Sequence, residues 1–449
     1  MSDIKVLSLN VCGLKSKLQC PEFIELIESN DILIFQESKL DKHDILELPK
    51  GYLYFSKHRS KFKKKSGGIV IIYRENFEKF LNFPKTKSDY VQWLVIHSNM
   101  LMIDKNLLLG CIYIPPENTK YASNDAFNDI ETEMSDLIEK TNSYVSLVGD
   151  FNAKTKLLSD IVIPDSKLFE ILDDIVDDDV LSYVYDYENL LQNDVPMKRY
   201  STDISVPNNY GHKLIDFCKR NNLYIGNGRL PGKDFLIGEK TCKNVSLIDY
   251  ILFSSHVFSL FKSFYVSEFN PLFSDVHSSL CFKFHATVNN FTINSSIDDS
   301  NTPTHTPRWI PKKQNQFIES INNDVTMFTT IESLLDELDE QGQGQHTKNT
   351  INLVVNKVGE LFKNSAKKVF GSNGRKRKTN TNKKFQIWFD NKCFETRKIF
   401  HKARNRYSFV KNRENRDAMR KASKQYKNQM NASYNKFQHS YFLFTQIPC

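Results

Sequence analysis

Eight short apolar runs, rich in β-branched residues, divide the first 285 residues of the chain. Each has the length of a buried strand, and Gly, Pro or Asn bounds several of them. Such runs, separated by helical or polar segments, indicate the buried strands of a sandwich with interleaved helices. The runs are KVLSLNV, DILIFQ, GIVIIY, VQWLVIH, NLLLGCIYI, YVSLVG, LIDYILF and LCFKFH.

The organisation of the chain changes after this α/β region. An acid-rich stretch at residues 156–200 is predicted to be an inserted loop or small subdomain. The predicted divisions are a domain over residues 1–285, a linker over 286–316, a helical segment over 317–373 and a basic helical extension over 374–449. Helices are expected over Glu22–Ser29, Asp125–Lys140, Gly211–Asn221, Gln316–Leu338, Asn349–Phe370 and Asp390–Lys436.

The positive charge is concentrated near the C-terminal end. The chain has a net charge of +8, but residues 374–436 hold 20 Lys and Arg against 4 Asp and Glu, so the rest is net acidic. A solvated helix could have this composition, but a nucleic-acid-facing arm is favoured because like charges at this density repel one another. The candidate nucleic-acid-binding residues are Arg375, Lys376, Arg377, Lys378, Arg404 and Arg406. The run at 375–378 also has the composition of a nuclear import signal.

The remaining composition argues against a membrane or secreted protein. No stretch approaches the roughly 18 apolar residues that span a bilayer, and the N-terminus lacks the pattern of a secretory signal. The 8 cysteines form no CxxC pair, so we expect them to be reduced. We therefore expect a nuclear or cytoplasmic protein with no membrane partner; the sequence does not indicate an oligomeric state.

Polar residues follow several of the predicted strands at the point where each strand ends. Asp150 and Asn152 follow YVSLV, Glu37 follows DILIF, Asn10 follows KVLSL and Tyr113 follows LLLGCI. A sheet presents such positions at one rim, and carboxylates there could bind Mg²⁺ for phosphodiester hydrolysis. Each residue taken singly is a weak signal, because turn formers and core residues also occupy such positions.

The order of these residues is more specific than any one of them. It resembles the motif order of the endonuclease/exonuclease/phosphatase superfamily over residues 4 to about 285. The pieces, in chain order, are Asn10, Glu37, Ser66-Gly67-Gly68, Tyr113, Asp150-Phe151-Asn152, Asp249, and Asp275 with His277. The resemblance implies a DNase I-like, four-layer α/β fold with two sheets, and an enzyme that uses Mg²⁺, with Mn²⁺ as an alternative.

The resemblance also implies a role for each matching residue. Glu37 would ligate the metal, with Asn10 contacting the metal site or phosphate and Asp275 as a secondary metal contact. Asp150 would orient or deprotonate the attacking water, and Asn152 would steady it. Tyr113 would place a phenol at the scissile phosphate, and His277 would form a hydrogen bond with a phosphoryl oxygen. Asp249 would be the acid that fixes the tautomer of His277.

Two positions depart from the family pattern. Val276 separates Asp275 from His277, where family members usually have Ser-Asp-His contiguous. Either a bulge restores the geometry, or the role of Asp275 is altered. Pro116-Glu117 stands where apurinic-site repair enzymes commonly have Asn, which argues against specificity for abasic sites.

Two segments favour one branch of the superfamily. Residues 209–232 look like part of the endonuclease of a non-LTR retrotransposon, and Trp388–Cys393 with the basic helix after it look like the connector to its reverse transcriptase. The resemblance implies a chain truncated before the polymerase that nicks DNA, with element RNA as a further possible partner. The alternative is a catalytically impaired remnant that binds nucleic acid through its basic extension.

Overall fold

The computed structural model describes residues 3–59, 65–165, 178–286, 313–340, 345–370 and 387–445. The chain forms two compact units. The first combines residues 1–293 with residues 385–449, and the second comprises residues 294–384. Each unit is described by itself below.

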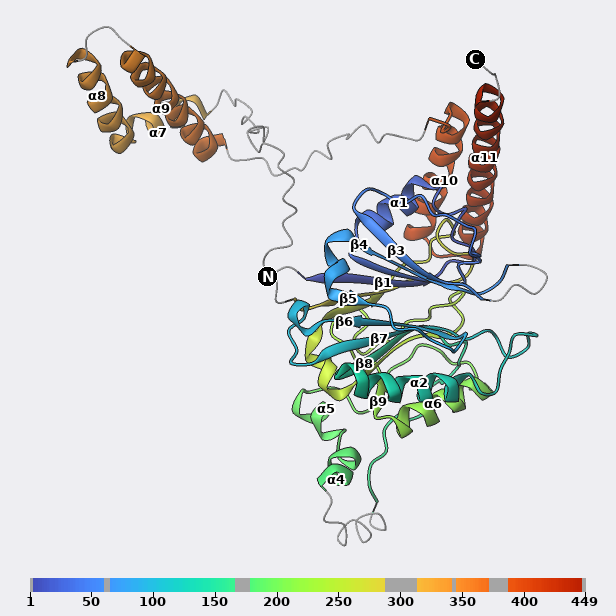
Figure 1. Ribbon diagram of the computed structural model, residues 1–449. Coiled ribbons are helices and arrows are strands. Elements are labelled where there is room, and N and C mark those ends of the chain that lie inside the picture. Colours follow the sequence, from blue (N-terminus) through green and yellow to red (C-terminus); the bar gives the residue numbers. More distant parts are fainter. Residues whose placement is uncertain are drawn as a thin grey trace. The chain divides into compact units, whose positions relative to one another are not determined.

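Two six-stranded sheets form the centre of the first unit (Figure 1). Sheet A has the order β11-β12-β1-β2-β4-β3, and sheet B the order β5-β6-β7-β8-β10-β9. The strands of sheet A are β1 (Ile4–Asn10), β2 (Ile32–Gln36), β3 (Tyr52–Lys57), β4 (Ile69–Arg74), β11 (Phe261–Val266) and β12 (Leu280–Phe284). Those of sheet B are β5 (Leu81–Asn82), β6 (Val91–Ile96), β7 (Asn106–Tyr113), β8 (Ser143–Asp150), β9 (Leu223–Ile225) and β10 (Asp249–Ser254).

Strand β2 illustrates why the strand sequences are apolar at consecutive positions. Ile32 and Ile34 belong to the core shared by the two sheets, whereas Leu33 and Phe35 belong to the core between sheet A and the helices that cover it. Side chains alternate between the faces of a strand, so a strand buried on both faces has no polar position. The eight predicted strands and the two-sheet sandwich are therefore confirmed.

Helices cover the outer face of each sheet, which makes four layers. On sheet B lie α2 (Ala126–Thr141) and α6 (Asn209–Arg220). On sheet A lie α1 (Pro21–Glu28) and, from the far end of the sequence, α10 (Asn391–Phe409) and α11 (Arg413–Thr445) (Figure 1). Shorter helices in this unit are η1 (Glu75–Phe80), η2 (Ser98–Met100), α4 (Asp178–Val184), α5 (Glu188–Gln192) and η3 (Ser255–Leu260).

The prediction of one long basic helix over Asp390–Lys436 was wrong, since the structure has two helices there. Val410 is extended, with φ −128° and ψ 94°, and α11 begins three residues later. Asn412 then accepts a hydrogen bond through Oδ1 from the backbone of Asn415. No Gly or Pro marks this break. The pair also buries one face on the sandwich, through Cys393, Phe400, Met419, Tyr426 and Met430.

The described residues of the second unit, 313–340 and 345–370, form three helices. They are α7 (Gln314–Asn322), α8 (Val325–Glu340) and α9 (Gln345–Phe370), so the segment predicted as one helix over Gln316–Leu338 is two. Phe317 of α7 contacts the rings of Phe362 and Phe370 in α9. Most of the predicted linker lies outside the described residues.

Candidate active site

Strand registers bring four of the predicted site residues to one edge of the sandwich. In sheet B, Asp150 lies opposite Tyr113 of the parallel strand β7 and opposite Asp249 of the antiparallel strand β10. Asn10 ends β1 in sheet A, and its Nδ2 donates to Asp150 Oδ2 over 2.9 Å. The ends of strands from both sheets therefore meet at Asp150.

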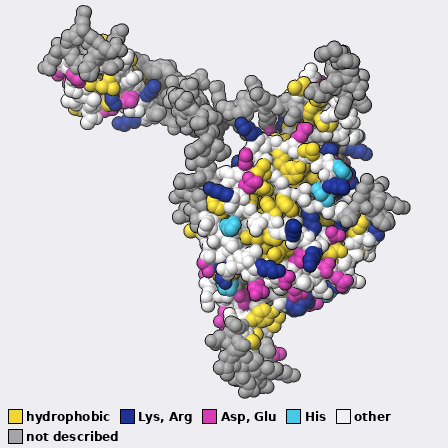
Figure 2. Space-filling model, viewed as in Figure 1, with side chains coloured by type: hydrophobic (Ala, Val, Ile, Leu, Met, Phe, Trp, Pro, Cys, Tyr) yellow, Lys and Arg dark blue, Asp and Glu magenta, His cyan; other side chains and the backbone are white. Residues whose placement is uncertain are grey.

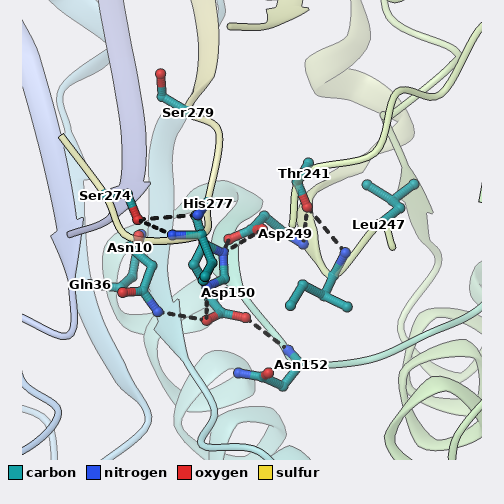
Figure 3. Close-up of polar contacts among 12 residues, drawn as sticks. Asn10, Gln36, Asp150, Asn152, Thr241, Leu247, Asp249, Ser274, His277 and Ser279 are labelled. Carbon is teal, nitrogen blue, oxygen red and sulfur yellow. Dashed lines mark hydrogen bonds and ion pairs between the residues drawn. The ribbon is translucent and has the colours of Figure 1, made fainter. Parts of the chain in front are cut away.

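His277 completes a buried group of three titratable side chains (Figure 3). Its Nδ1 lies 3.0 Å from Asp249 Oδ2, and its Nε2 lies 3.8 Å from Asp150 Oδ2. One ligand atom from each of the three residues lies within 4.8 Å of the others. Asp249 therefore orients the imidazole through Nδ1, while among the described residues Nε2 has a more distant partner in Asp150.

The close carboxylates control the charge of the imidazole. Burial lowers the pKa of His277, but the negative charges of Asp249 and Asp150 outweigh burial and raise it to about 9. The pKa of Asp150 is raised to about 7, first by burial and then by the charge of Asp249, although His277 and the hydrogen bond from Asn10 oppose this shift. The two shifts favour the protonated form of the imidazole and raise the proton affinity of the Asp150 carboxylate beside it.

Tyr113 is the buried phenol that β7 contributes to the same edge. Burial and the nearby charges of Glu37 and Asp150 raise its pKa, so its hydroxyl remains protonated. The Arg59 guanidinium lies 5.7 Å from the centre of the Tyr113 ring. Sequence analysis missed Arg59, whose only signal is its place in the basic segment before Gly67 and Gly68.

Asn152 is held close to Asp150 in an uncommon backbone conformation. Its φ is +48°, and its backbone N–H donates to Asp150 Oδ1 over 3.0 Å. Its Nδ2 donates to the Ile114 carbonyl over 2.9 Å. Asn208, which caps α6, donates from its amide to the Asn152 carbonyl over 3.0 Å. The helix start thereby fixes the loop that carries Asn152.

The two other predicted metal contacts lie outside the three-residue group. Glu37 follows β2 with φ +52° and lies 3.4 Å from the Lys39 amino group, but its charge also acts on His277 and Tyr113. Asp275 instead contacts Lys17 at 3.7 Å and Lys427 of α11 at 3.4 Å. Glu37 therefore acts on the cluster through its charge, whereas Asp275 pairs with lysines.

The extra residue Val276 is accommodated in the loop before β12. Ser274 Oγ accepts from the backbone N–H of His277 over 3.1 Å, and the Lys243 N–H donates to the Val276 carbonyl over 2.8 Å. Thr241 Oγ1 in turn accepts from the Asp249 N–H over 3.1 Å (Figure 3). These loop contacts hold both members of the Asp249–His277 pair, so the insertion leaves the pair intact.

The donor set of this edge fits a divalent cation. Asp150 and Asp249 offer two carboxylates beside the His277 imidazole, and Glu37 adds a half-buried carboxylate near them. Beside Asn10, the fully buried Gln36 has an Oε1 with no hydrogen-bond partner among the described residues. Buried carboxylates and an unpaired buried oxygen are favourable where a cation or its bound water supplies the missing interaction.

A two-sheet sandwich with an Asp-Asp-His group where its strand ends meet defines a hydrolase of phosphate esters. The chain belongs to the endonuclease/exonuclease/phosphatase family, whose model matches residues 7–275. The expectation of this superfamily is thereby confirmed, and with it hydrolysis of the nuclease or phosphatase type.

Solved structures with similar folds include several enzymes that act on nucleic acids. The endonuclease domain of TRAS1, a telomere-specific non-LTR retrotransposon, is 14% identical, with 63% of this chain and 99% of that chain covered and a TM-score of 0.38. The AP endonuclease LMAP from Leishmania major is 14% identical, with 63% and 88% covered and a TM-score of 0.43. The 3′ phosphatase NExo from Neisseria is 16% identical, with 63% and 99% covered and a TM-score of 0.38. The search of curated proteins found no match.

The predicted nucleic-acid-binding residues are only partly described. Arg375–Lys378 lie outside the described residues, whereas Arg404 and Arg406 lie on α10. Arg404 is half-buried and Arg406 is exposed. Figure 2 shows basic and acidic side chains mixed over the face in view, with hydrophobic ones among them. None of the helices among the described residues is both long and apolar enough to cross a membrane.

Proposed function

We propose that this chain nicks one strand of DNA by Mg²⁺-dependent hydrolysis, as the endonuclease of a non-LTR retrotransposon does. The observation that carries the proposal is the Asp150–Asp249–His277 group, joined to sheet A by the bond from Asn10. It provides a protonated donor and a carboxylate that can accept a proton, within one buried cluster. Mn²⁺ is the alternative cation.

Asp150, His277 and Asp249 each have a separate role in the proposed reaction. Asp150 takes a proton from the attacking water, which suits a carboxylate with a pKa raised towards neutrality. The water oxygen forms a bond to phosphorus while the bond to the leaving 3′ oxygen breaks. The 3′ oxygen takes a proton from solvent water, which yields a 3′ hydroxyl and a 5′ phosphate. His277 donates a hydrogen bond from Nε2 to a phosphoryl oxygen as negative charge accumulates there. Asp249 stabilises the positive charge of the His277 imidazole.

The remaining site residues bind and orient the substrate. Tyr113 stays protonated, and its hydroxyl donates a hydrogen bond to the scissile phosphate. The Asn152 amide holds the attacking water in position. Glu37 and Asn10 would hold the cation, together with the carboxylates of the cluster, and Asp275 would contact it secondarily. When bound, Mg²⁺ supplies positive charge that neutralises the phosphoryl oxygens and lowers the pKa of its water.

Two sequence segments support the retrotransposon branch of the proposal. Residues 209–232 and Trp388–Cys393 resemble parts of these elements. In the structure, Trp388 and Phe389 are buried with α11 against the core that α1 covers. A connector that packs on the nuclease in this way would belong to the same folded unit as the active site.

A second function would remain if the site were catalytically impaired. The exposed face of the basic α10–α11 pair, with Arg404 and Arg406, favours binding of DNA or of element RNA. A chain that only binds nucleic acid would shift DNA in a gel without relaxing supercoils.

We further propose that the protein acts in the nucleus, with Arg375–Lys378 as the import signal.

Relaxation of supercoiled plasmid by the full chain tests the proposed function. We expect open circles in Mg²⁺ and none in EDTA. Asp150→Asn should lower the nicking rate by at least about 100-fold, because it removes the proton acceptor while preserving side-chain size. Glu37→Gln should likewise abolish nicking and leave DNA binding nearly intact.

The matched control is Asp136→Asn, on the exposed surface of α2, where the carboxylate pairs with Lys140 at 3.5 Å. It makes the same chemical change outside the site and should nick at the wild-type rate. Equal nicking by Asp150→Asn and Asp136→Asn would contradict the assignment. Binding without nicking by the wild-type chain would favour the second function.

A further inference from the structure

A groove of about 680 Å³ lies between the sandwich and the C-terminal helices of the first unit. One side is formed by residues 233–244 and by β11, and the other by α10 and the start of α11. Ser278, the residue after His277, lines it, and so does Asn244, which follows Lys243. The Lys243 N–H donates a hydrogen bond to the carbonyl of Val276. The loop that carries His277 therefore also forms part of the groove wall.

Tyrosine rings and basic groups line this groove. Tyr265 of β11 is 37% exposed, and Tyr407 of α10 is half-buried with its hydroxyl 3.5 Å from Asn244 Nδ2. The Lys233 amino group lies 5.9 Å from the centre of the Tyr265 ring. Each ring thus stands at the groove beside a polar or basic neighbour.

The charges that line the groove favour an anionic occupant. The basic residues are Lys233, Lys240, Arg404 and Lys411, and the acidic ones are Glu239 and Glu268. Glu268 is paired with Lys411 at 3.4 Å. Arg404 and two lysines therefore remain against the single carboxylate of Glu239.

We propose that this groove binds a single-stranded polynucleotide, with bases stacked on Tyr407 and Tyr265 and phosphates at Arg404 and the two lysines. Stacking on aromatic side chains and a basic groove are the two elements of single-strand binding without sequence preference. The bases of a duplex are already stacked on each other and cannot use the rings without unpairing. The inference rests on the proposed function, because a strand in this groove, whose wall includes the loop that carries His277, would continue from the nicked substrate.

Equilibrium binding measured in EDTA tests the groove separately from catalysis. The probes are fluorescein-labelled oligothymidylate and oligouridylate of about 12 nucleotides, within the site sizes of single-strand binders, and a blunt duplex of equal length. We expect the full chain to bind a single strand more tightly than the duplex. The tighter of the two oligonucleotides identifies DNA or RNA as the occupant.

Two pairs of variants separate the groove from general electrostatics. Tyr407→Leu keeps apolar packing but loses the aromatic face, so it should weaken binding of the single strand about tenfold. Tyr407→Phe retains the aromatic face and should bind the single strand as the wild type does. Arg404→Gln should reduce the slope of log affinity against log salt by about 0.7, the value for one phosphate contact to a single strand. Lys402→Gln removes the same charge from α10 at an exposed position that does not line the groove and should leave the slope unchanged.

The outcomes distinguish this inference from the proposed function. A chain that fails to nick but shows these binding differences would retain the groove. Equal binding by Tyr407→Leu and Tyr407→Phe, or equal salt slopes for Arg404→Gln and Lys402→Gln, would overturn it. So would preference for the duplex over both single strands.

Discussion

Asn10 Nδ2 donates to Asp150 Oδ2 over 2.9 Å, and this hydrogen bond joins the end of β1 in sheet A to the end of β8 in sheet B. Both side chains are buried, at 3% and 1% exposure. The position of the Asp150 carboxylate therefore depends on how the two sheets pack, and the apolar core between them indirectly sets the geometry of the site.

Removal of this bond should impair both activity and stability. Asn10→Ala leaves the buried Asp150 carboxylate without its side-chain donor, at a cost of about 1–3 kcal/mol in the free energy of unfolding. Since the bond from Asn10 lowers the pKa of Asp150, the variant should also shift that pKa further up. We expect a nicking rate about 10- to 100-fold lower, measured with supercoiled plasmid.

Asn82→Ala, at an exposed position of the edge strand β5, is the control for loss of an asparagine side chain. It should nick like the wild type. A normal rate in Asn10→Ala, with thermal unfolding also unchanged, would show that the bond between the sheets has no part in catalysis.

The charge of His277 can be followed without activity. In the cation-free protein its imidazole should titrate well above the usual histidine value of 6.5, with a pKa of about 9, because Asp249 and Asp150 stabilise the charged form. Asp249→Asn should lower the midpoint, since it removes the nearer carboxylate. The measurement is the NMR titration of the His277 ring protons.

The same shift predicts the direction of the dependence of stability on pH. A histidine whose pKa is raised on folding contributes its full stabilisation below the unfolded value of 6.5 and loses it as pH rises towards 9. The unfolding free energy of the wild type should therefore fall over this range relative to that of His277→Gln. A His277 midpoint at or below 6.5 would contradict the arrangement of charges.

The strands were predictable because burial on both faces leaves a local signature in the sequence. Leu33 and Phe35 are apolar because they pack in the core under the helices, and Ile32 and Ile34 because they pack in the core between the sheets. The apolar run of β2 can therefore be recognised from the sequence alone. Site residues such as Asn10 and Asp150 were found because they end strands. Their roles still rest on the family resemblance and on the experiments proposed for them.

Features that depend on loops and long-range packing left no such signature. Arg59 reaches the Tyr113 ring from a basic segment with no periodicity, and Ser274 and Thr241 hold His277 and Asp249 through loop contacts. The break at Val410 lacks Gly and Pro, so α10 and α11 read as one helix. Their buried face is sparse in apolar residues and is recognisable only from the sandwich that it covers.

Gly211 should be intolerant of any side chain because of a close approach of two backbones. A Cβ at this position in α6 would lie 1.9 Å from the Lys154 carbonyl oxygen. Asn208 also accepts from the Lys154 N–H over 2.7 Å, so the same helix start positions the loop after Asn152. Gly211→Ala should move this loop, with nicking reduced about 10-fold or more, as expected when a reacting group is misplaced by about 1 Å.

Gly359→Ala is the control for this change, since nothing lies within 4 Å of a Cβ at position 359 in α9. It should nick at the wild-type rate and be no less stable. Wild-type nicking by Gly211→Ala would mean that the position of the loop after Asn152 does not limit the reaction.

Glu22 links the sandwich to the C-terminal helices through a buried network. Its Oε1 accepts from Arg397 Nε over 2.6 Å and lies 2.8 Å from His401 Nε2, and its Oε2 lies 3.4 Å from the Tyr426 hydroxyl. Burial raises the pKa of Glu22, but the hydrogen bond to His401 and the charge of Arg397 outweigh it and lower the pKa to about 2. The ionised form is therefore the one that holds α10 in place.

A carboxylate with a lowered pKa stabilises the fold above its unfolded value near 4.5 and loses this contribution as pH falls towards 2. Glu22→Gln should lack this part of the pH dependence and cost about 2–3 kcal/mol near neutral pH, because the buried ion pair between Glu22 and Arg397 is lost. Urea unfolding at several pH values measures both effects, and limited proteolysis should show earlier cleavage within α10. Glu28→Gln, exposed on the same helix, is the control. If both variants unfold alike at neutral pH, α10 is held by its apolar contacts alone.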